Sequence, residues 1–262
     1  MTKNQANFRD ELLRLPGQSV DEMLDRYDDD EVNPTVASLV FAIFLLGFVL
    51  LHAAYPIFDN TWPLVFILSA AIVYFTFRLR KARQTIRALV QGRDGERYVG
   101  QLLEKMRVDG HIIFHDVKAE HFNIDHVVIG PKGVYVIETK TWSKLPGKGK
   151  VSYRDGKFSV NGKIFATNPL EQAKKNSQWF YGLLKKSTGK TIPVVPVVVM
   201  PDWFIEPEDT KNARADGVLF VNPKALSAFI GRGSGALSPE DIHLASYHVE
   251  MHVKHAGRLF AK

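Results

Sequence analysis

The chain has 262 residues, of which 45% are hydrophobic, so it can form one soluble domain of ordinary size with apolar sequence left over. Residues 1–77 carry four basic and ten acidic side chains, a net charge of −6, whereas residues 78–262 carry thirty and eighteen, a net charge of +12. This split favours a polyanionic partner for the second part, either nucleic acid or an anionic membrane surface, and charge alone does not distinguish the two.

The N-terminal third contains two apolar runs that follow a polar segment. Residues 8–27 show helical periodicity interrupted at Pro16-Gly17, which indicates short amphipathic helices. The runs that follow, 36–58 and 62–77, are almost free of charged side chains, and each is long enough to cross a bilayer as a helix. A buried core hairpin is the alternative interpretation, but the continuity of the runs favours a membrane. The acid-rich residues that precede them argue against a secretory signal peptide.

The charges beside the second run predict an orientation. Four basic residues lie between Arg78 and Arg83, directly after the run, and such clusters are retained on the cytoplasmic side. We therefore expect a transmembrane hairpin with both ends of the chain in the cytoplasm. The absence of cysteine agrees with this location but does not establish it.

The rest of the chain alternates between helical and strand patterns. A basic helical stalk is expected first, then a helix that opens at Asp94 or Gly95 and ends at Met106. Asn168 is expected to cap another helix, which runs from Pro169 to about Leu184. The remaining predicted elements are strands at 112–117, 124–130, 134–140, 192–200 and 218–221, a double hairpin over 151–166 and a helix over 238–254. This order predicts an α/β fold.

Three charged residues interrupt the apolar strand patterns. Asp125 lies in the second expected strand, while Glu138 and Lys140 share one face at the end of the third. A divalent cation between the two acids would explain their presence, because Mg²⁺ prefers oxygen ligands and keeps several waters. The alternative is a solvated strand end, with Lys140 paired to one acid. These three residues alone leave both interpretations open.

The facing of the two acids depends on the turn that joins the strands. A two-residue loop at Pro131-Lys132 would place Asp125 directly opposite Glu138. A type I turn with Gly133 in the left-handed conformation suits the proline better and would place Thr139 opposite Asp125 instead. A bulge near the strand ends would then be needed to restore the facing.

Three segments in this order resemble a known family. They are GRDGERYVGQLL with Glu96, NIDHVVIGPKGVYVIETKTW with Asp125, Glu138 and Lys140, and NPLEQAKKN with Gln172. Together with the Gly-Pro-x-Gly turn, they resemble the nuclease-related domain of the PD-(D/E)XK nuclease superfamily, over residues 92–200. The resemblance implies a restriction-endonuclease-like fold, in which helices flank a central mixed β-sheet, and metal-dependent cleavage of DNA phosphodiester bonds.

The resemblance also assigns roles to individual residues. It implies that Asp125 and Glu138 hold Mg²⁺ or Mn²⁺, that Lys140 orients or deprotonates the attacking water, and that Glu96 and Gln172 support the site. For Glu96 and Gln172, an ordinary exposed position on a helix is the alternative. Six further side chains are candidates for contacts with DNA, and each has solvated surface as its alternative: Trp142, Lys144, Lys148, Lys150, Lys174 and Lys175.

These inferences combine into one expected organisation. Residues 1–34 form a cytoplasmic segment, 35–80 two transmembrane helices, 81–91 a basic stalk, 92–205 the nuclease-like domain and 206–262 an α/β extension packed on it. The expected protein is a DNA nuclease in a bacterial inner membrane, with its soluble domain in the cytoplasm and a homo-oligomer or a membrane complex as a further possibility. The alternative is a catalytically idle module of the same fold that holds nucleic acid or a partner at the membrane.

Overall fold

The computed structural model describes residues 13–54, 61–142, 149–165, 167–233 and 235–259. The described chain divides into two compact units. The helical unit comprises Val20–Val90, and the α/β unit comprises the described residues of 1–19 and 91–262. Each unit is described by itself.

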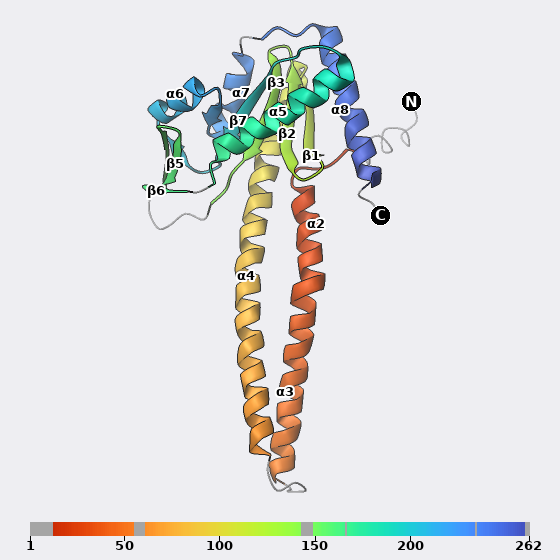
Figure 1. Cartoon of the computed structure of the whole chain (residues 1–262), viewed down its shortest axis with the longest axis vertical. Coiled ribbons are helices and arrows are strands. Elements are labelled where there is room, and N and C mark those ends of the chain that lie inside the picture. The colour runs from red at the N-terminus through yellow and green to blue at the C-terminus, as the bar shows by residue number, and fades with distance from the viewer. Residues whose placement is uncertain (1–12, 55–60, 143–148, 166, 234, 260–262) are drawn as a thin grey trace. The chain divides into compact units, whose positions relative to one another are not determined.

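The helical unit is a helical hairpin. Its first arm contains α2 (Gln18–Tyr27), a short π-helix η1 (Asp28–Val32) and α3 (Asn33–Ala54), and its second arm is the first part of α4 (Trp62–Glu104) (Figure 1). The expected interruption at Pro16-Gly17 is present, because Gly17 has a φ of +73° just before α2 begins. Residues 55–58 of the first apolar run lie outside the described residues.

Both arms expose apolar side chains to their surroundings. By length and composition alone, the two helices are long and apolar enough to cross a membrane. A soluble helix of this kind would bury one face in a core. The exposed large side chains of these arms include Val40, Phe41, Phe44, Phe48 and Leu51 on α3, and Trp62, Phe66, Ile67, Val73 and Phe77 on α4.

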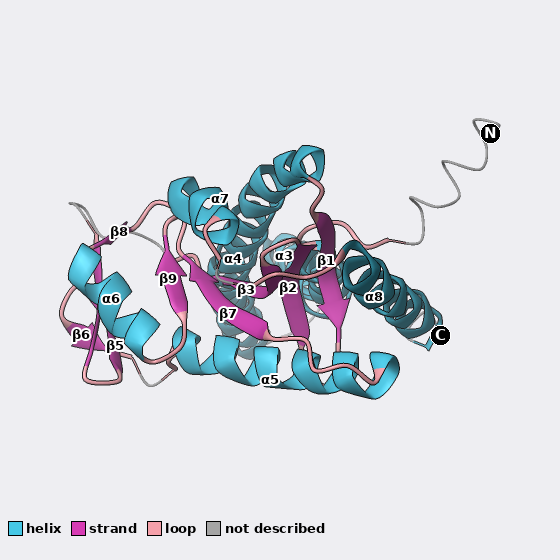
Figure 2. Cartoon of the chain, turned by 90° about the horizontal axis from the view of Figure 1, so that it is seen from above, coloured by secondary structure: helices cyan, strands magenta, loops and turns pink. Residues whose placement is uncertain are grey.

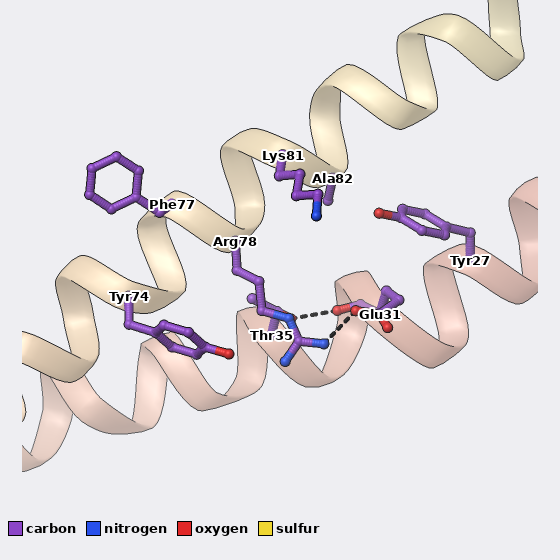
Figure 3. A pocket seen from close by; sticks show the side chains of 8 residues that line it. All are labelled: Tyr27, Glu31, Thr35, Tyr74, Phe77, Arg78, Lys81 and Ala82. Carbon is purple, nitrogen blue, oxygen red and sulfur yellow. Dashed lines mark hydrogen bonds and ion pairs between the residues drawn. The ribbon is translucent and has the colours of Figure 1, made fainter.

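A cavity of about 650 Å³ lies between the two arms of the helical unit, where both become polar. Figure 3 shows Arg78 of α4 reaching across to an ion pair with Glu31 of η1. Thr35 donates a hydrogen bond to the backbone oxygen of Glu31, 2.6 Å away. The acidic run of the first arm therefore meets the first residue of the basic cluster on the second.

The expected helix start at Asp94 or Gly95 was wrong, because α4 continues without a break from Trp62 to Glu104. A 3₁₀ turn, η2 (Lys105–Asp109), follows it and ends at Gly110 with a φ of +78°. The Asp94-Gly95 pair resembled a helix start, but Gly95 serves close packing instead. A Cβ atom at Gly95 would lie 2.2 Å from Cγ2 of Thr141, so only glycine allows this approach of the helix to the sheet.

The α/β unit is built on a mixed five-stranded sheet with the order β1-β2-β3-β7-β9. The strands β1 (Ile112–Lys118), β2 (Asn123–Gly130) and β3 (Gly133–Thr139) are antiparallel neighbours. The strands β7 (Val194–Val199) and β9 (Leu219–Val221) then run parallel to β3. Figure 2 shows helices on both faces of this sheet. The expected mixed sheet flanked by helices is confirmed, and it is consistent with a nuclease-like fold.

Each face of the sheet buries its own apolar cluster. On one face, α5 (Pro169–Thr188) and α8 (Pro239–Leu259) pack on β1, β2 and β3 through residues such as Phe180, Leu184 and Val249. On the other face, the end of α4 and α7 (Pro223–Gly231) pack on β3 and β7 through Leu103 and Ile230. Burial on both faces explains why β3 and β7 are apolar almost throughout.

A second, smaller sheet has the order β6-β5-β4-β8. It contains β4 (Lys150–Arg154), β5 (Lys157–Val160), β6 (Lys163–Ile164) and β8 (Phe204–Ile205), and α6 (Pro207–Ala215) packs beside it. Both predicted hairpin turns are present, with positive φ at Asp155, Gly156, Asn161 and Gly162. The side chain of Asn168 accepts a hydrogen bond from the N–H of Leu170, so the predicted helix cap is also present.

Candidate active site

The register of the β2–β3 hairpin brings Asp125 beside Glu138. The paired residues run from Gly130 with Gly133 to His126 with Ile137, and the next position in this register pairs the two acids. The two-residue loop is therefore the one that forms, and no slip of register occurs. Gly133 makes this two-residue loop compatible with Pro131, because Gly133 has a φ of +133°, a value that residues other than glycine rarely adopt.

Hydrogen bonds hold the Glu138 carboxylate inside the α/β unit. Its side chain is almost completely buried. Gln172 of α5 donates to Oε1 over 2.7 Å, and Asn176, one turn later, donates to Oε2 over 3.0 Å. Lys140 places its Nζ 2.7 Å from the same Oε1. Three side chains thus fix the orientation of one buried carboxylate.

Asp125 is held by the neighbouring strand. The backbone N–H of Thr139 donates to its Oδ2 over 2.6 Å. Burial raises the pKa of Asp125 well above its ordinary value, and the negative charges of Glu138 and Glu96 raise it further. Burial also raises the pKa of Glu138, although Lys140 and Asn176 counteract part of that effect. Protein groups alone leave an excess of negative charge between the strands.

Lys140 follows β3 and is anchored through its backbone, whose N–H donates to the oxygen of Val199 over 2.9 Å. Burial lowers the pKa of Lys140, but the charge and hydrogen bond of Glu138 and the charges of Asp125 and Glu96 raise it more strongly in combination. The net result is a pKa above the ordinary value. The side chain is therefore a cation at neutral pH and a poor proton acceptor.

The acids of this site suit a hard divalent cation. Among the described residues, no group of three or more histidine, aspartate or glutamate side chains is arranged to hold a metal ion. Mg²⁺, however, is commonly bound through one or two carboxylates and several waters. Asp125 and Glu138 supply two carboxylates with raised pKa values, so a positive charge between them would favour their ionised forms. The donor set thus fits Mg²⁺ or Mn²⁺.

The structure brings Asp125, Glu138, Lys140 and Gln172 together, and the charge of Glu96 acts on both Asp125 and Lys140. Sequence reasoning missed Asn176, which completes the hold on Glu138. Its signal was present in the sequence, because residues four apart on a helix share a face and Gln172 precedes Asn176 by four.

The predicted DNA contacts have varied surroundings. Trp142 stacks on Phe158 with ring centroids 5.3 Å apart, so packing occupies part of its ring. Lys150 pairs with Glu206 over 2.6 Å, and Lys174 pairs with Glu171 over 2.9 Å. Lys175 is exposed on α5. Lys144 and Lys148 lie outside the described residues, and contact of any of these side chains with DNA remains a prediction.

A buried pair of histidines, His115 on β1 and His126 on β2, adjoins the site beside Asp125. Nδ1 of His115 lies 2.8 Å from Nδ1 of His126, and Nε2 of His115 lies 2.8 Å from Oε1 of Glu104. Burial lowers the pKa of both histidines. Both rings are therefore neutral at neutral pH. Their hydrogen bonds connect the end of α4 to β1, and β1 to β2.

Comparison with known proteins identifies the part of the chain that carries the site. Residues 91–201 match the family model described as the nuclease-related domain. Comparison with curated proteins gave no match, and comparison with solved structures gave none either. The matched range contains Asp125, Glu138, Lys140, Gln172 and Asn176. The match over residues 91–201 therefore confirms the resemblance to the nuclease-related domain that the sequence motifs indicate.

Proposed function

We propose that the protein is a membrane-anchored, metal-dependent nuclease that hydrolyses DNA phosphodiester bonds at the cytoplasmic face of the membrane. The observation that carries this proposal is the register that sets Asp125, near the start of β2, beside Glu138, near the end of β3, next to the cation Lys140. The match to the nuclease-related domain supports a nuclease or nucleic-acid-related function in general.

Asp125 and Glu138 are the residues that would hold Mg²⁺ or Mn²⁺. When bound, the cation would lower the pKa of a water ligand and neutralise charge that builds up on the phosphate. Glu138 is presented by Gln172 and Asn176, whose amide groups keep its carboxylate in one orientation. Such preorganisation means that little rearrangement is needed when the substrate arrives.

Lys140 then acts as a positive charge rather than as a base. Because its pKa is raised, its ammonium group keeps its proton at neutral pH. It can donate hydrogen bonds to the attacking water and to the phosphate oxygens as negative charge develops there. The raised pKa of Lys140 supports the orienting role over the deprotonating one.

The apolar arms of the helical unit support membrane anchoring. Both helices are long and apolar enough to span, and Arg78 marks the point where the second arm becomes polar. Basic residues next to a span favour the cytoplasmic side, which would place the nuclease-related domain where DNA is present.

The test uses full-length protein in detergent, incubated with linear, circular and single-stranded DNA in the presence of Mg²⁺, Mn²⁺ or a chelator. We expect cleavage only with metal. Asp125→Asn and Glu138→Gln should abolish cleavage and weaken metal binding, whereas Lys140→Ala should abolish cleavage and keep the metal affinity. Glu120→Gln is the matched control, because Glu120 is a largely exposed acid between β1 and β2.

Two results would contradict the proposal. Cleavage by Asp125→Asn at the parent rate would show that the acids play no catalytic part. DNA binding without cleavage under any metal condition would instead support the alternative, a non-catalytic module that holds nucleic acid at the membrane. Calorimetry with Mg²⁺ alone separates loss of the metal site from loss of the chemical step.

A further inference from the structure

The α/β unit contains a second cavity at the opposite end of the parallel strands from Asp125 and Glu138. Its volume is about 590 Å³, which is within the range of small-molecule sites. Tyr135, Val195 and Leu219 line it, and these residues stand near the beginnings of β3, β7 and β9. Glu138 lies near the other end of β3, so the two sites are separate.

Three of the described basic side chains line this cavity, and no acidic side chain among the described residues does. Lys132 comes from the turn between β2 and β3, Arg214 from the last turn of α6, and Arg232 from the end of α7. In the described part of the chain, none of the three forms an ion pair. Elsewhere in the α/β unit many cations are paired, including Lys150, Lys174, Lys190, Lys211 and Lys254.

Close packing of the backbone fixes the position of this basic rim. A Cβ atom at Gly235 would lie 2.5 Å from the backbone oxygen of Lys132, and one at Gly233 would lie 2.0 Å from the hydroxyl oxygen of Tyr135. The N–H of Leu237 donates to the oxygen of Pro131 over 3.0 Å. Only glycine permits these approaches, and they hold the residues after α7 against the β2–β3 turn.

The remaining wall of the cavity is apolar. Val195 and Leu219 contribute aliphatic side chains, Phe229 of α7 contributes an aromatic ring, and Leu237 adds a further aliphatic group. Such a lining suits the flat, weakly polar body of a ligand, while the cations suit its charged end. A ligand with one carboxylate would leave two of the three cations without a counter-charge.

We propose that this cavity binds a nucleoside polyphosphate. The phosphate groups would lie at Lys132, Arg214 and Arg232, and the base would lie against Phe229 and its aliphatic neighbours. Arginine suits this task because its planar group can donate two hydrogen bonds to one phosphate. Arg214, Phe229 and Arg232 all follow residue 201, where the family match ends. The site is therefore assigned independently of the nuclease activity.

The first experiment measures binding of ATP and GTP by calorimetry to full-length protein in detergent with excess chelator. The chelator removes divalent metal, so the acids of the nuclease site cannot take up a nucleotide through a cation. We expect nucleoside triphosphate to bind at least ten times more tightly than inorganic triphosphate or adenosine, because each of these probes fills only one half of the cavity. Asp125→Asn should bind nucleotide as the parent does.

Variants locate the ligand. Arg214→Gln and Arg232→Gln should each weaken nucleotide binding about tenfold, since each removes a charged hydrogen bond. Phe229→Leu should weaken binding of the nucleotide but not of inorganic triphosphate. Lys224→Gln is the matched control: Lys224 is an exposed cation on the same helix, outside the cavity, and its loss should change nothing.

Absence of nucleotide binding would overturn the proposal, and so would unchanged binding in both arginine variants. Equal affinity for nucleotide and inorganic triphosphate would also overturn it, because the apolar wall would then contribute nothing to binding of the nucleoside. Thermal unfolding of each variant distinguishes a lost contact from a lost fold. None of these outcomes depends on whether the protein cleaves DNA.

Discussion

At the scale of single residues, the acids that interrupt β2 and β3 differ in how the protein stabilises them. Glu138 receives hydrogen bonds from Gln172 and Asn176 and lies beside the ammonium group of Lys140. Asp125 receives one backbone hydrogen bond and experiences the negative charges of two other acids. An unpaired buried charge is costly, so Asp125 is the residue that a bound cation would relieve most.

The raised pKa of Asp125 predicts how stability depends on pH in the absence of metal. A carboxyl group with a higher pKa in the folded state than in the unfolded state binds more protons when folded. The contribution of Asp125 to stability should therefore be greatest at low pH and should fall as the pH rises above the ordinary value of 3.8. Each unit by which folding raises the pKa corresponds to about 1.4 kcal/mol lost at high pH.

Asp125→Asn should flatten this pH dependence and raise the melting temperature of the metal-free protein near neutral pH, since it removes a repelled charge. The measurement is thermal unfolding in chelator between pH 5 and pH 8, with Glu120→Gln as the control. Mg²⁺ should restore stability to the parent at pH 8 but not to the variant. An equally steep pH dependence in parent and variant would contradict the assignment of the raised pKa to Asp125.

The sequence predicted the charged and polar residues of the candidate site, because such side chains are unusual in apolar strands and therefore stand out. The alternation of strand side chains placed Glu138 and Lys140 on one face, and the resemblance to the nuclease-related domain assigned Asp125 and Gln172 to the same site. The sequence could not decide the turn at Pro131, because the φ of Gly133 is a property of the folded backbone. Nor could it reveal that His115 and His126 face each other, because a strand histidine that binds a substrate and one that bonds to a neighbouring side chain occur in the same sequence pattern.

At the scale of secondary-structure elements, local signals predicted the helix cap at Asn168 and both turns of the double hairpin. They did not predict that α4 runs unbroken to Glu104, nor that β9 joins the main sheet beside β7. Both features depend on contacts between distant residues. The contact of Gly95 with Thr141 is one of these, and it brings the helix that carries Glu96 to the end of β3.

Gly95→Ala should destabilise the protein in spite of the better helix propensity of alanine. The new Cβ atom would lie 2.2 Å from Cγ2 of Thr141, and overpacking of this kind costs about 1–3 kcal/mol. The higher helix propensity of alanine offsets about 1 kcal/mol of this cost. We expect a net loss on the order of 1 kcal/mol in the free energy of unfolding, together with reduced cleavage because Glu96 moves with the helix.

Two further variants test the cause. Thr141→Ser removes the clashing methyl group, so the double variant Gly95→Ala/Thr141→Ser should recover the loss. Gly92→Ala is the control on the same helix, because nothing lies within 4 Å of its added Cβ atom, and it should be neutral or stabilising. A double variant as unstable as Gly95→Ala alone would show that the helix does not depend on this contact. Denaturant or thermal unfolding of the four proteins decides the matter.

At the scale of the whole molecule, exposed apolar surface and net positive charge lie in different parts of the chain. The two arms of the helical unit expose apolar side chains, and they become polar at the same level, where Glu31 pairs with Arg78. Figure 3 shows Tyr27 and Lys81 in the same polar region. Apolar surface of this extent is unusual on a soluble monomer and suits a lipid environment. The residues from 78 onward carry the net charge of +12 that favours a polyanion.

The membrane hairpin predicts opposite exposure for two positions in the chain. Asn60 precedes α4 in the short connection between the apolar runs, whereas Lys224 is exposed on α7 of the α/β unit. The chain contains no cysteine, so a single introduced cysteine reports its own location without background. In spheroplasts, a membrane-impermeant maleimide should label Asn60→Cys directly and Lys224→Cys only after lysis. Inverted vesicles should give the reverse, because in the proposed topology the basic cluster at Arg78 keeps both ends of the hairpin in the cytoplasm. Labelling of both positions from one side would rule out a spanning hairpin. The exposed apolar surface of the two arms would then have to be covered by a partner other than the membrane interior.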